Sequence, residues 1–169
     1  MYELSFAAWV KPAAFPSSDK VIAGKGSDGW ELLLTPQGKL KLVNNVVRRP
    51  VSTQTTISAG ALQPGVWSHI AFTEQQNPPN KTIKLFINGA KEVTANYNPV
   101  RANKSDVGIG NTLAQNKGFS GEIFDPKFYT REMTEADVTY LYANTQPPVT
   151  AANCSDSAFV SQSVPGTMQ

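Results

Sequence analysis

The feature that most constrains this chain is a series of short apolar segments with period-two alternation, separated by turn signals roughly every 8–12 residues. These segments are 2–10, 21–23, 30–34, 39–43, 67–73 and 83–87. Asn88-Gly89 is a strong hairpin signal, because both central residues of a type I′ turn need positive φ. Internal repeats are absent from the sequence. The pattern therefore predicts an all-β fold, a two-sheet antiparallel jelly-roll sandwich.

Two further segments complete the expected architecture. Residues 44–58 are rich in Asn, Val, Arg, Ser and Thr, which favours one irregular or edge strand at about 46–56. Near the end, Thr134 is placed to cap one short C-terminal helix over 135–142, with Asp137 as its capping-box partner and Val138, Leu141 and Tyr142 on one face.

The domain boundary follows from a change in composition. We expect residues 1–146 to form one jelly-roll domain and residues 147–169, rich in Ser, Thr, Pro and Ala, to form an extended arm or linker with one strand at 158–160. The lone Cys154 lies in this arm and cannot form a disulfide within the chain.

Charge and hydropathy exclude several classes of partner. The net charge of +2 comes with scattered Lys and Arg, so we expect no nucleic-acid partner. No run approaches the ~20 apolar residues of a membrane span, so we expect no membrane insertion. We also expect no signal peptide within the given sequence, since an expected strand begins directly after Met1. This predicts either a trimmed longer protein or export by another route.

Three stretches in order carry a resemblance to a known family. They are Phe-Ala-Ala-Trp-Val-Lys-Pro at 6–12, the Leu, Trp, His and Thr pattern of 62–73 running into Asn-Gly at 88–89, and 109–129 followed by Met-Thr and the helix. Together they span about 4–143 and resemble the laminin G-like jelly-roll domains of the concanavalin A-like lectin and glucanase superfamily. The resemblance implies a jelly roll that often serves carbohydrate recognition or adhesion.

The chain departs from this family in two places. Phe124 stands where members commonly carry an acidic residue, followed by Asp125, and Pro126 replaces a branched apolar residue. Because proline cannot donate a ladder hydrogen bond, this strand is expected to be an edge or to carry a bulge. Members usually have another strand before the opening one, so the arm or another chain is expected to supply that edge.

The residues favour a non-catalytic protein. The glucanase branch of the superfamily uses a Glu-x-Asp-x-x-Glu strand, which this chain lacks. Glu122 and Asp125 are three apart and would point to opposite faces of a regular strand. His69 is the only histidine, and the resemblance implies a structural role for it in a strand. We therefore expect the chain not to be an enzyme.

Two kinds of binding site remain as hypotheses. Calcium is the one candidate cofactor, because relatives bind it with carboxylates at the sandwich rim; the metal candidates are Asp19, Asp28, Asp106 and Asp125. The alternative is that each Asp is a turn residue bonding its own backbone. The best constellation for a sugar ring combines one aromatic with polar neighbours, namely Asp28, Trp30, Asn44, Asn45, Arg48 and Arg49. The alternative is core or rim packing for all three tryptophans and a solvated loop for the two arginines.

Two functions fit this fold. The first is a non-catalytic binding module for carbohydrate or glycoconjugates, or an adhesion domain, in an extracellular or surface protein. The alternative is a structural or assembly module of a larger surface, filament or virion protein, whose partner is a neighbouring subunit that the arm docks on. Sequons at Asn80, Asn103 and Asn153 permit export without showing it.

Overall fold

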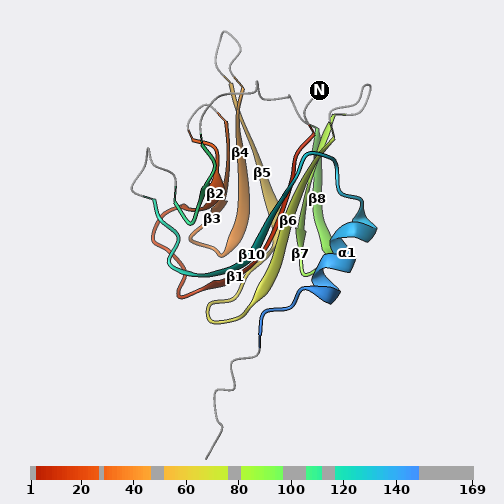
Figure 1. Ribbon diagram of the computed structural model, residues 1–169. Helices are drawn as coiled ribbons and strands as arrows, with labels where there is room; N and C mark the ends of the chain where they lie inside the picture. Colours follow the sequence, from red (N-terminus) through yellow and green to blue (C-terminus); the bar gives the residue numbers. More distant parts are fainter. Residues whose placement is uncertain are drawn as a thin grey trace, which may run out of the picture.

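The chain folds into two antiparallel five-stranded sheets stacked as two layers (Figure 1). The computed structural model describes residues 3–26, 29–46, 52–75, 81–96, 106–111 and 117–148. One sheet has the order β10 (Gly121–Tyr129), β1 (Ser5–Pro12), β6 (Ser68–Gln75), β7 (Thr82–Ile87) and β8 (Ala90–Asn96). The other has the order β5 (Ser52–Ala61), β4 (Lys39–Val46), β3 (Trp30–Leu34), β2 (Lys20–Gly24) and β9 (Gly108–Ile109). The predicted all-β, two-sheet class is confirmed.

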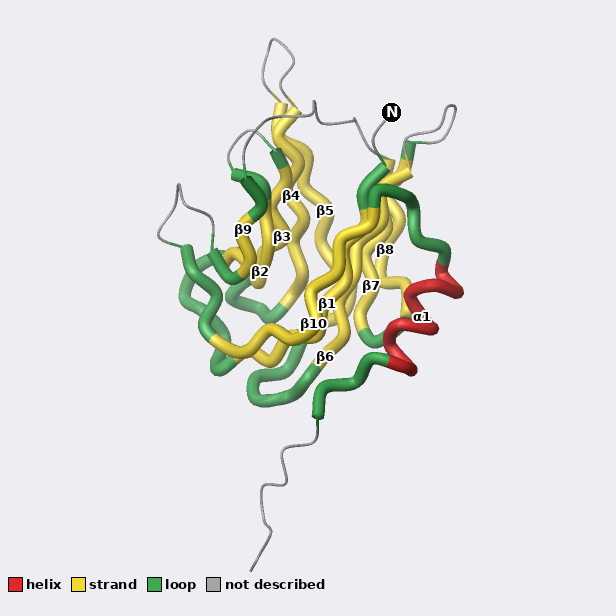
Figure 2. Tube along the Cα trace, viewed as in Figure 1, coloured by secondary structure: helices red, strands yellow, loops and turns green. Residues whose placement is uncertain are grey.

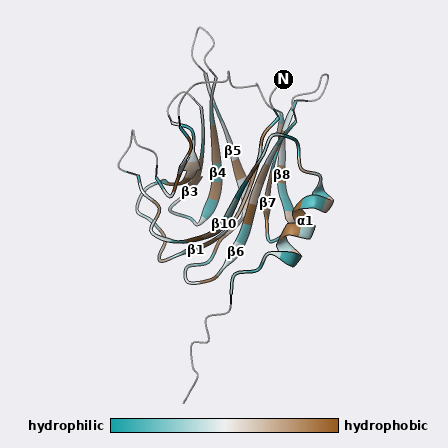
Figure 3. Cartoon of the chain, viewed as in Figure 1, coloured by the Kyte–Doolittle hydropathy of each residue, from teal (hydrophilic) through white to brown (hydrophobic). Residues whose placement is uncertain are grey.

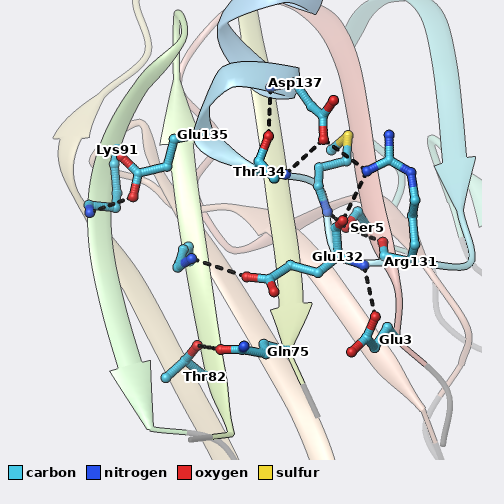
Figure 4. Close-up of polar contacts among 12 residues, drawn as sticks. Glu3, Ser5, Gln75, Thr82, Lys91, Arg131, Glu132, Thr134, Glu135 and Asp137 are labelled. Atoms are coloured by element: carbon cyan, nitrogen blue, oxygen red, sulfur yellow. Dashed lines mark hydrogen bonds and ion pairs between the residues drawn. The ribbon is translucent and has the colours of Figure 1, made fainter. Parts of the chain in front are cut away.

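The helix α1 (Glu135–Asn144) lies against the outer face of the sheet that contains β1, as both Figure 1 and Figure 2 show. It begins with the predicted capping box: Asp137 N donates to Thr134 Oγ1 (3.1 Å), and Thr134 N donates to Asp137 Oδ2 (2.9 Å; Figure 4). The Arg131 guanidinium forms an ion pair and a hydrogen bond with the same carboxylate at 2.8 Å. This hydrogen bond, together with the capping hydrogen bonds of Thr134, lowers the pKa of Asp137 to about 2. Within the described ranges, no helix has the length and apolar character needed to cross a membrane.

Two apolar clusters lie on opposite faces of this sheet. Between the sheets, the main core gathers inward side chains from both layers, including Phe6, Leu32, Leu42 and Phe72. Beneath α1, a second cluster joins sheet residues to helix residues: Ala7, Ala71, Phe86, Met133, Val138 and Leu141. Figure 3 shows that α1 carries both hydrophobic and hydrophilic segments, as a helix covering a sheet on one side requires.

The presence of an apolar cluster on each face of this sheet corrects one expectation from the sequence, which concerns β1. Period-two alternation, as in residues 2–10, is typical of a strand with one buried face. Both faces of β1 are buried, however, since Phe6, Ala8 and Val10 face the core while Ser5 and Ala7 lie under the helix segment. Ser5 Oγ donates to Arg131 O (2.7 Å) and accepts from Met133 N (2.9 Å; Figure 4). The helix and the turn before it occupy the face that the sequence assigned to solvent.

Most predicted strands and turns are confirmed, with shifted ends. The hairpin of β3 and β4 pairs Leu34 with Leu40, and the turn after β7 has positive φ at Asn88 (50°) and Gly89 (78°), as type I′ requires. The expected edge strand at 46–56 is β5, which begins at Ser52 and continues to Ala61, while β4 extends to Val46. The strand expected at 158–160 and Cys154 lie outside the described residues.

The strand that carries Pro126 is both an edge and bulged, which confirms the prediction from proline chemistry. Between the pairs Ala7–Lys127 and Trp9–Phe124, one residue of β1 faces two of β10, and Asp125 adopts a φ of 52°. Because β10 and β6 flank β1 on its two sides, β1 has no vacant edge. Any added strand would have to join β10 or β8 in this sheet. Whether the arm or another chain supplies such a strand stays a prediction.

Candidate ligand-binding site

The outer face of the β1 sheet carries a pocket of about 290 Å³ beside the C-terminal end of α1. Three segments line it: the end of β1, the turn that leads into β6, and the chain after the helix. The lining residues are Trp9, Lys11, Gly65, Trp67, Gln146, Pro147 and Pro148. Its volume is near the lower end of the roughly 300–1,000 Å³ typical of small-ligand sites.

Trp9 forms a fixed floor for this pocket. Its side chain is 5% exposed, lies stacked on Tyr142 with ring centroids 5.6 Å apart, and meets His69 edge-on at 5.4 Å. The indole Nε1 donates to Thr145 Oγ1 at 3.1 Å, and that hydroxyl donates to Leu141 O at 2.6 Å. The floor therefore anchors the helix end and holds the wall formed by residues 146–148 in place.

The rim presents two accessible aromatic rings. Trp67 is half-buried in the segment before β6, and Phe124, opposite Trp9 in the β1–β10 register, is 37% exposed. Their centroids are 6.4 Å apart with an interplanar angle of 71°, an edge-to-face pair. Trp9 and Phe124 are register partners on neighbouring strands and point away from the core, and Trp67, directly before β6, contacts Phe124 on the same face.

One ion pair crosses the rim. Lys11 and Glu122 are partners in the β1–β10 register, and Lys11 Nζ lies 2.5 Å from Glu122 Oε1. The same ammonium lies 5.5 Å from the centroid of the Trp67 ring, within the range of a cation–π contact. Lys11 is the one charged side chain among the described residues that line the pocket.

His69 lies beneath this site and has the surroundings of a structural residue. Its side chain is 1% exposed between Trp9 and Tyr142. Burial lowers the pKa of His69 to about 4. The positive charge of Lys127 also lowers this pKa to a smaller extent, and the negative charge of Asp125 partly opposes the shift. The imidazole is therefore neutral at neutral pH, and it packs against the pocket floor rather than facing a ligand.

The bulge also corrects the expected placement of the two carboxylates of β10. In a regular strand Glu122 and Asp125 would lie on opposite faces. Here Glu122 pairs with Lys11, and Asp125 pairs with Lys127, whose register partner Ala7 packs beneath the helix segment. Both carboxylates thus lie on the outer face, each beside its own lysine, because the extra bulge residue shifts the alternation by one.

The structure describes only two side chains of the sugar-binding constellation predicted from the sequence, those of Trp30 and Asn44. Trp30 is 4% exposed and packs in the main core against Phe72, with centroids 4.9 Å apart. Asn44 is its register partner, is 1% exposed and has a buried Oδ1 without a hydrogen-bond partner. Trp30 therefore serves as core packing, the alternative set out for the tryptophans. Asp28, Arg48, Arg49 and the side chain of Asn45 lie outside the described residues.

The predicted calcium ligands are not gathered in one place by the described part of the structure. Asp19 pairs with Lys41 at 2.8 Å, Asp125 pairs with Lys127, and Asp106 is exposed in the segment before β9. Asp28 lies outside the described ranges. Among the described residues, no group of three or more His, Cys, Asp or Glu side chains could hold a metal ion. The described carboxylates do not form a calcium site. Because Asp28 lies outside the described ranges, calcium binding stays a prediction.

Sequence reasoning missed most of the pocket. Trp9, Lys11 and Trp67 could have been associated, since antiparallel pairing of the segments 6–12 and 67–73 brings them to one face. Gln146, which lines the pocket, and Phe124, which contacts Trp67 beside it, could not, because their positions depend on the path of the chain after α1 and on β10 joining the far side of β1. Long-range topology, rather than local pattern, assembles the site.

Comparisons with solved structures agree with this architecture. Domain 4 of the extracellular GH43 arabinanase AbnA from Geobacillus stearothermophilus, solved with arabinotriose, matches with a TM-score of 0.65 and 22% identity over 83% of this chain and 66% of that chain. The botulinum neurotoxin type G receptor-binding domain matches with a TM-score of 0.67 and 14% identity over 85% of this chain and 38% of that chain. This chain thus spans less than two thirds of either.

A further similar structure is the CBM40 of Ruminococcus gnavus IT-sialidase bound to α2,3 sialyllactose. It has a TM-score of 0.67 and 18% identity over 84% of this chain and 83% of that chain. No curated protein sequence matches this chain significantly. A laminin G family model, described as the concanavalin A-like lectin/glucanases superfamily, matches residues 2–139. The chain therefore belongs to the concanavalin A-like lectin/glucanase superfamily.

Proposed function

We propose that this chain is a non-catalytic carbohydrate-binding module whose ligand occupies the pocket between Trp9, Trp67 and Gln146. The observation that carries the proposal is the accessible pair of Trp67 and Phe124 at the rim of a pocket that also offers an amide and an ammonium group. A sugar ring has an apolar face for an aromatic ring and hydroxyls for polar neighbours.

The similar structures support this class of ligand. Two of those described above are solved with oligosaccharides, arabinotriose in one and sialyllactose in the other. At their level of identity they support the fold, while the ligand for this chain rests on the pocket itself. A glycan-binding role also favours an extracellular or surface location, as the sequence predicted.

The arrangement of acidic groups favours binding over hydrolysis. Glycosidases need two carboxyl groups flanking the scissile bond, one of them protonated as the acid. On the pocket side of the sheet, Glu122 and Asp125 each form an ion pair with a lysine, so each carboxylate is engaged by its own chain. His69, the one histidine of the chain, is buried beneath the floor.

Trp67→Ala tests the proposal. The intact protein is first applied to an array of neutral and acidic oligosaccharides, and the strongest glycan is then titrated by calorimetry. Removal of the ring should weaken binding by about tenfold or more, as expected for an aromatic anchor in an interface. Tyr140→Ala is the matched control, because Tyr140 is an exposed aromatic on α1 away from the pocket. Equal affinity in the two variants, or no bound glycan, would refute the proposal.

The assembly alternative depends on residues 147–169, of which the structure describes only the first two. It stays a prediction, and light scattering of the full chain beside a chain ending at Pro148 tests it. Self-association lost on truncation would favour docking by the arm. Two monomers would exclude it.

A further inference from the structure

We propose that Glu122 makes this site selective for uncharged glycans, by neutralising Lys11 and placing a carboxylate at the rim of the pocket. The inference rests on the proposed carbohydrate-binding function and names the ligand class and the residue that sets it. It follows from the geometry of the ion pair beside the aromatic rim.

The Lys11–Glu122 pair is held in place before any ligand arrives. The two residues are direct partners in the β1–β10 register, and their charged atoms are 2.5 Å apart. On its other side, the ammonium lies over the Trp67 ring. The one cation that lines the described pocket is thus engaged by a carboxylate of the same chain and by an aromatic face.

An acidic sugar would need this cation for itself. To pair with Lys11, its carboxylate must displace Glu122, which acts at the high effective concentration of a group on the neighbouring strand. If it binds without displacing Glu122, two like charges lie close together, which is unfavourable. A neutral sugar meets neither obstacle, because it uses ring contacts with Trp67 and hydrogen bonds to groups such as the Gln146 amide.

The exposure of the pair sets the expected size of this effect. The Lys11 side chain is 29% exposed and that of Glu122 is 60% exposed, so solvent and salt screen their charges. Partly exposed pairs are worth well under the energy of buried ones, so the selectivity should change by about three- to fivefold. Raising the salt concentration should reduce the change.

The experiment uses matched pairs of glycans that differ only in a terminal sialic or uronic acid, tested with the full chain. The wild type should prefer the neutral member of each pair. Glu122→Gln should raise the affinity for the acidic member relative to the neutral one by about three- to fivefold at low salt. Glu135→Gln is the control, since it removes an equal charge from a carboxylate of α1 that is paired with Lys91 of β8. This control should leave the ratio of the affinities for the acidic and the neutral glycan unchanged.

A double variant tests whether the gain passes through the lysine. Adding Lys11→Met to Glu122→Gln should remove the gain for acidic glycans, because the freed cation is then absent. A wild type that binds acidic members as tightly as neutral ones overturns the inference while the proposed function stands. Equal changes in Glu122→Gln and Glu135→Gln also overturn it, since the effect would then be long-range. If no glycan binds the wild type, both proposals fall.

Discussion

Phe86→Ala tests whether the helix and the sheet beneath it form a genuine second core that supports the pocket. Phe86 is fully buried in β7 and faces outward, where it packs with residues of β1, β6 and the helix segment, including Ala71, Met133 and Leu141. Removing the ring leaves a void at the centre of this cluster. Because Leu141 accepts the hydrogen bond that ties Thr145 to the helix end, the pocket wall depends on the same packing.

The expected loss follows from the size of the group removed. Phe→Ala changes in cores cost about 3–5 kcal/mol, from lost transfer energy and the cavity left behind. The lower part of this range, about 3 kcal/mol, is expected here, because α1 lies on the surface and can settle toward the sheet. That loss is a large share of the roughly 5–15 kcal/mol of a typical domain.

Urea unfolding followed by circular dichroism measures the change. Phe124→Ala serves as the matched control, since it removes the same group from an exposed position, and should cost less than about 1 kcal/mol. Phe86→Ala should also weaken glycan binding, because the helix end positions residues 146–148. Similar stability losses in the two variants would mean that α1 does not cover this face, and the reasoning would be wrong.

Two further predictions concern the helix start and the buried histidine. Thr134→Ala should cost about 1 kcal/mol of unfolding free energy, and Thr134→Ser should restore most of it, because either hydroxyl accepts the capping hydrogen bond from Asp137 N. His69 has a folded pKa of about 4, against an ordinary value of 6.5 for histidine, so the unfolded state binds its proton first as the pH falls. The contribution of His69 to the free energy of unfolding should therefore be complete above about pH 6.5, decrease as the pH falls to 4, and stay constant below that. The total loss should be on the order of 3 kcal/mol or less. Urea midpoints measured across this range should show the slope in the wild type and lose it in His69→Gln.

Local patterns predicted most of the strands, the hairpins and the capped helix, because each of these depends on neighbouring residues. The type I′ turn needs only Asn88 and Gly89, and the capping box needs only Thr134 and Asp137. Proline chemistry likewise predicted the bulged edge at Pro126. These features are decided within a few residues of the chain.

Features that depend on distant segments were not predictable in this way. Alternation over residues 2–10 could not reveal that α1 covers the second face of β1. It also could not show whether Trp30 points into the core or toward a ligand, since both occur on a strand face. The pocket combines segments from β1, the turn before β6, and the chain after α1, so only the three-dimensional fold reveals it.

The most direct test of the account is an NMR titration of the three tryptophan indole N–H signals with the strongest glycan from the array. The indoles of Trp67 and Trp9 line the proposed site, whereas that of Trp30 lies in the core. The account predicts that the signals of Trp67 and Trp9 shift in proportion to saturation while that of Trp30 stays in place. A shift of Trp30 alone would contradict the account and move the site to the constellation first predicted from the sequence.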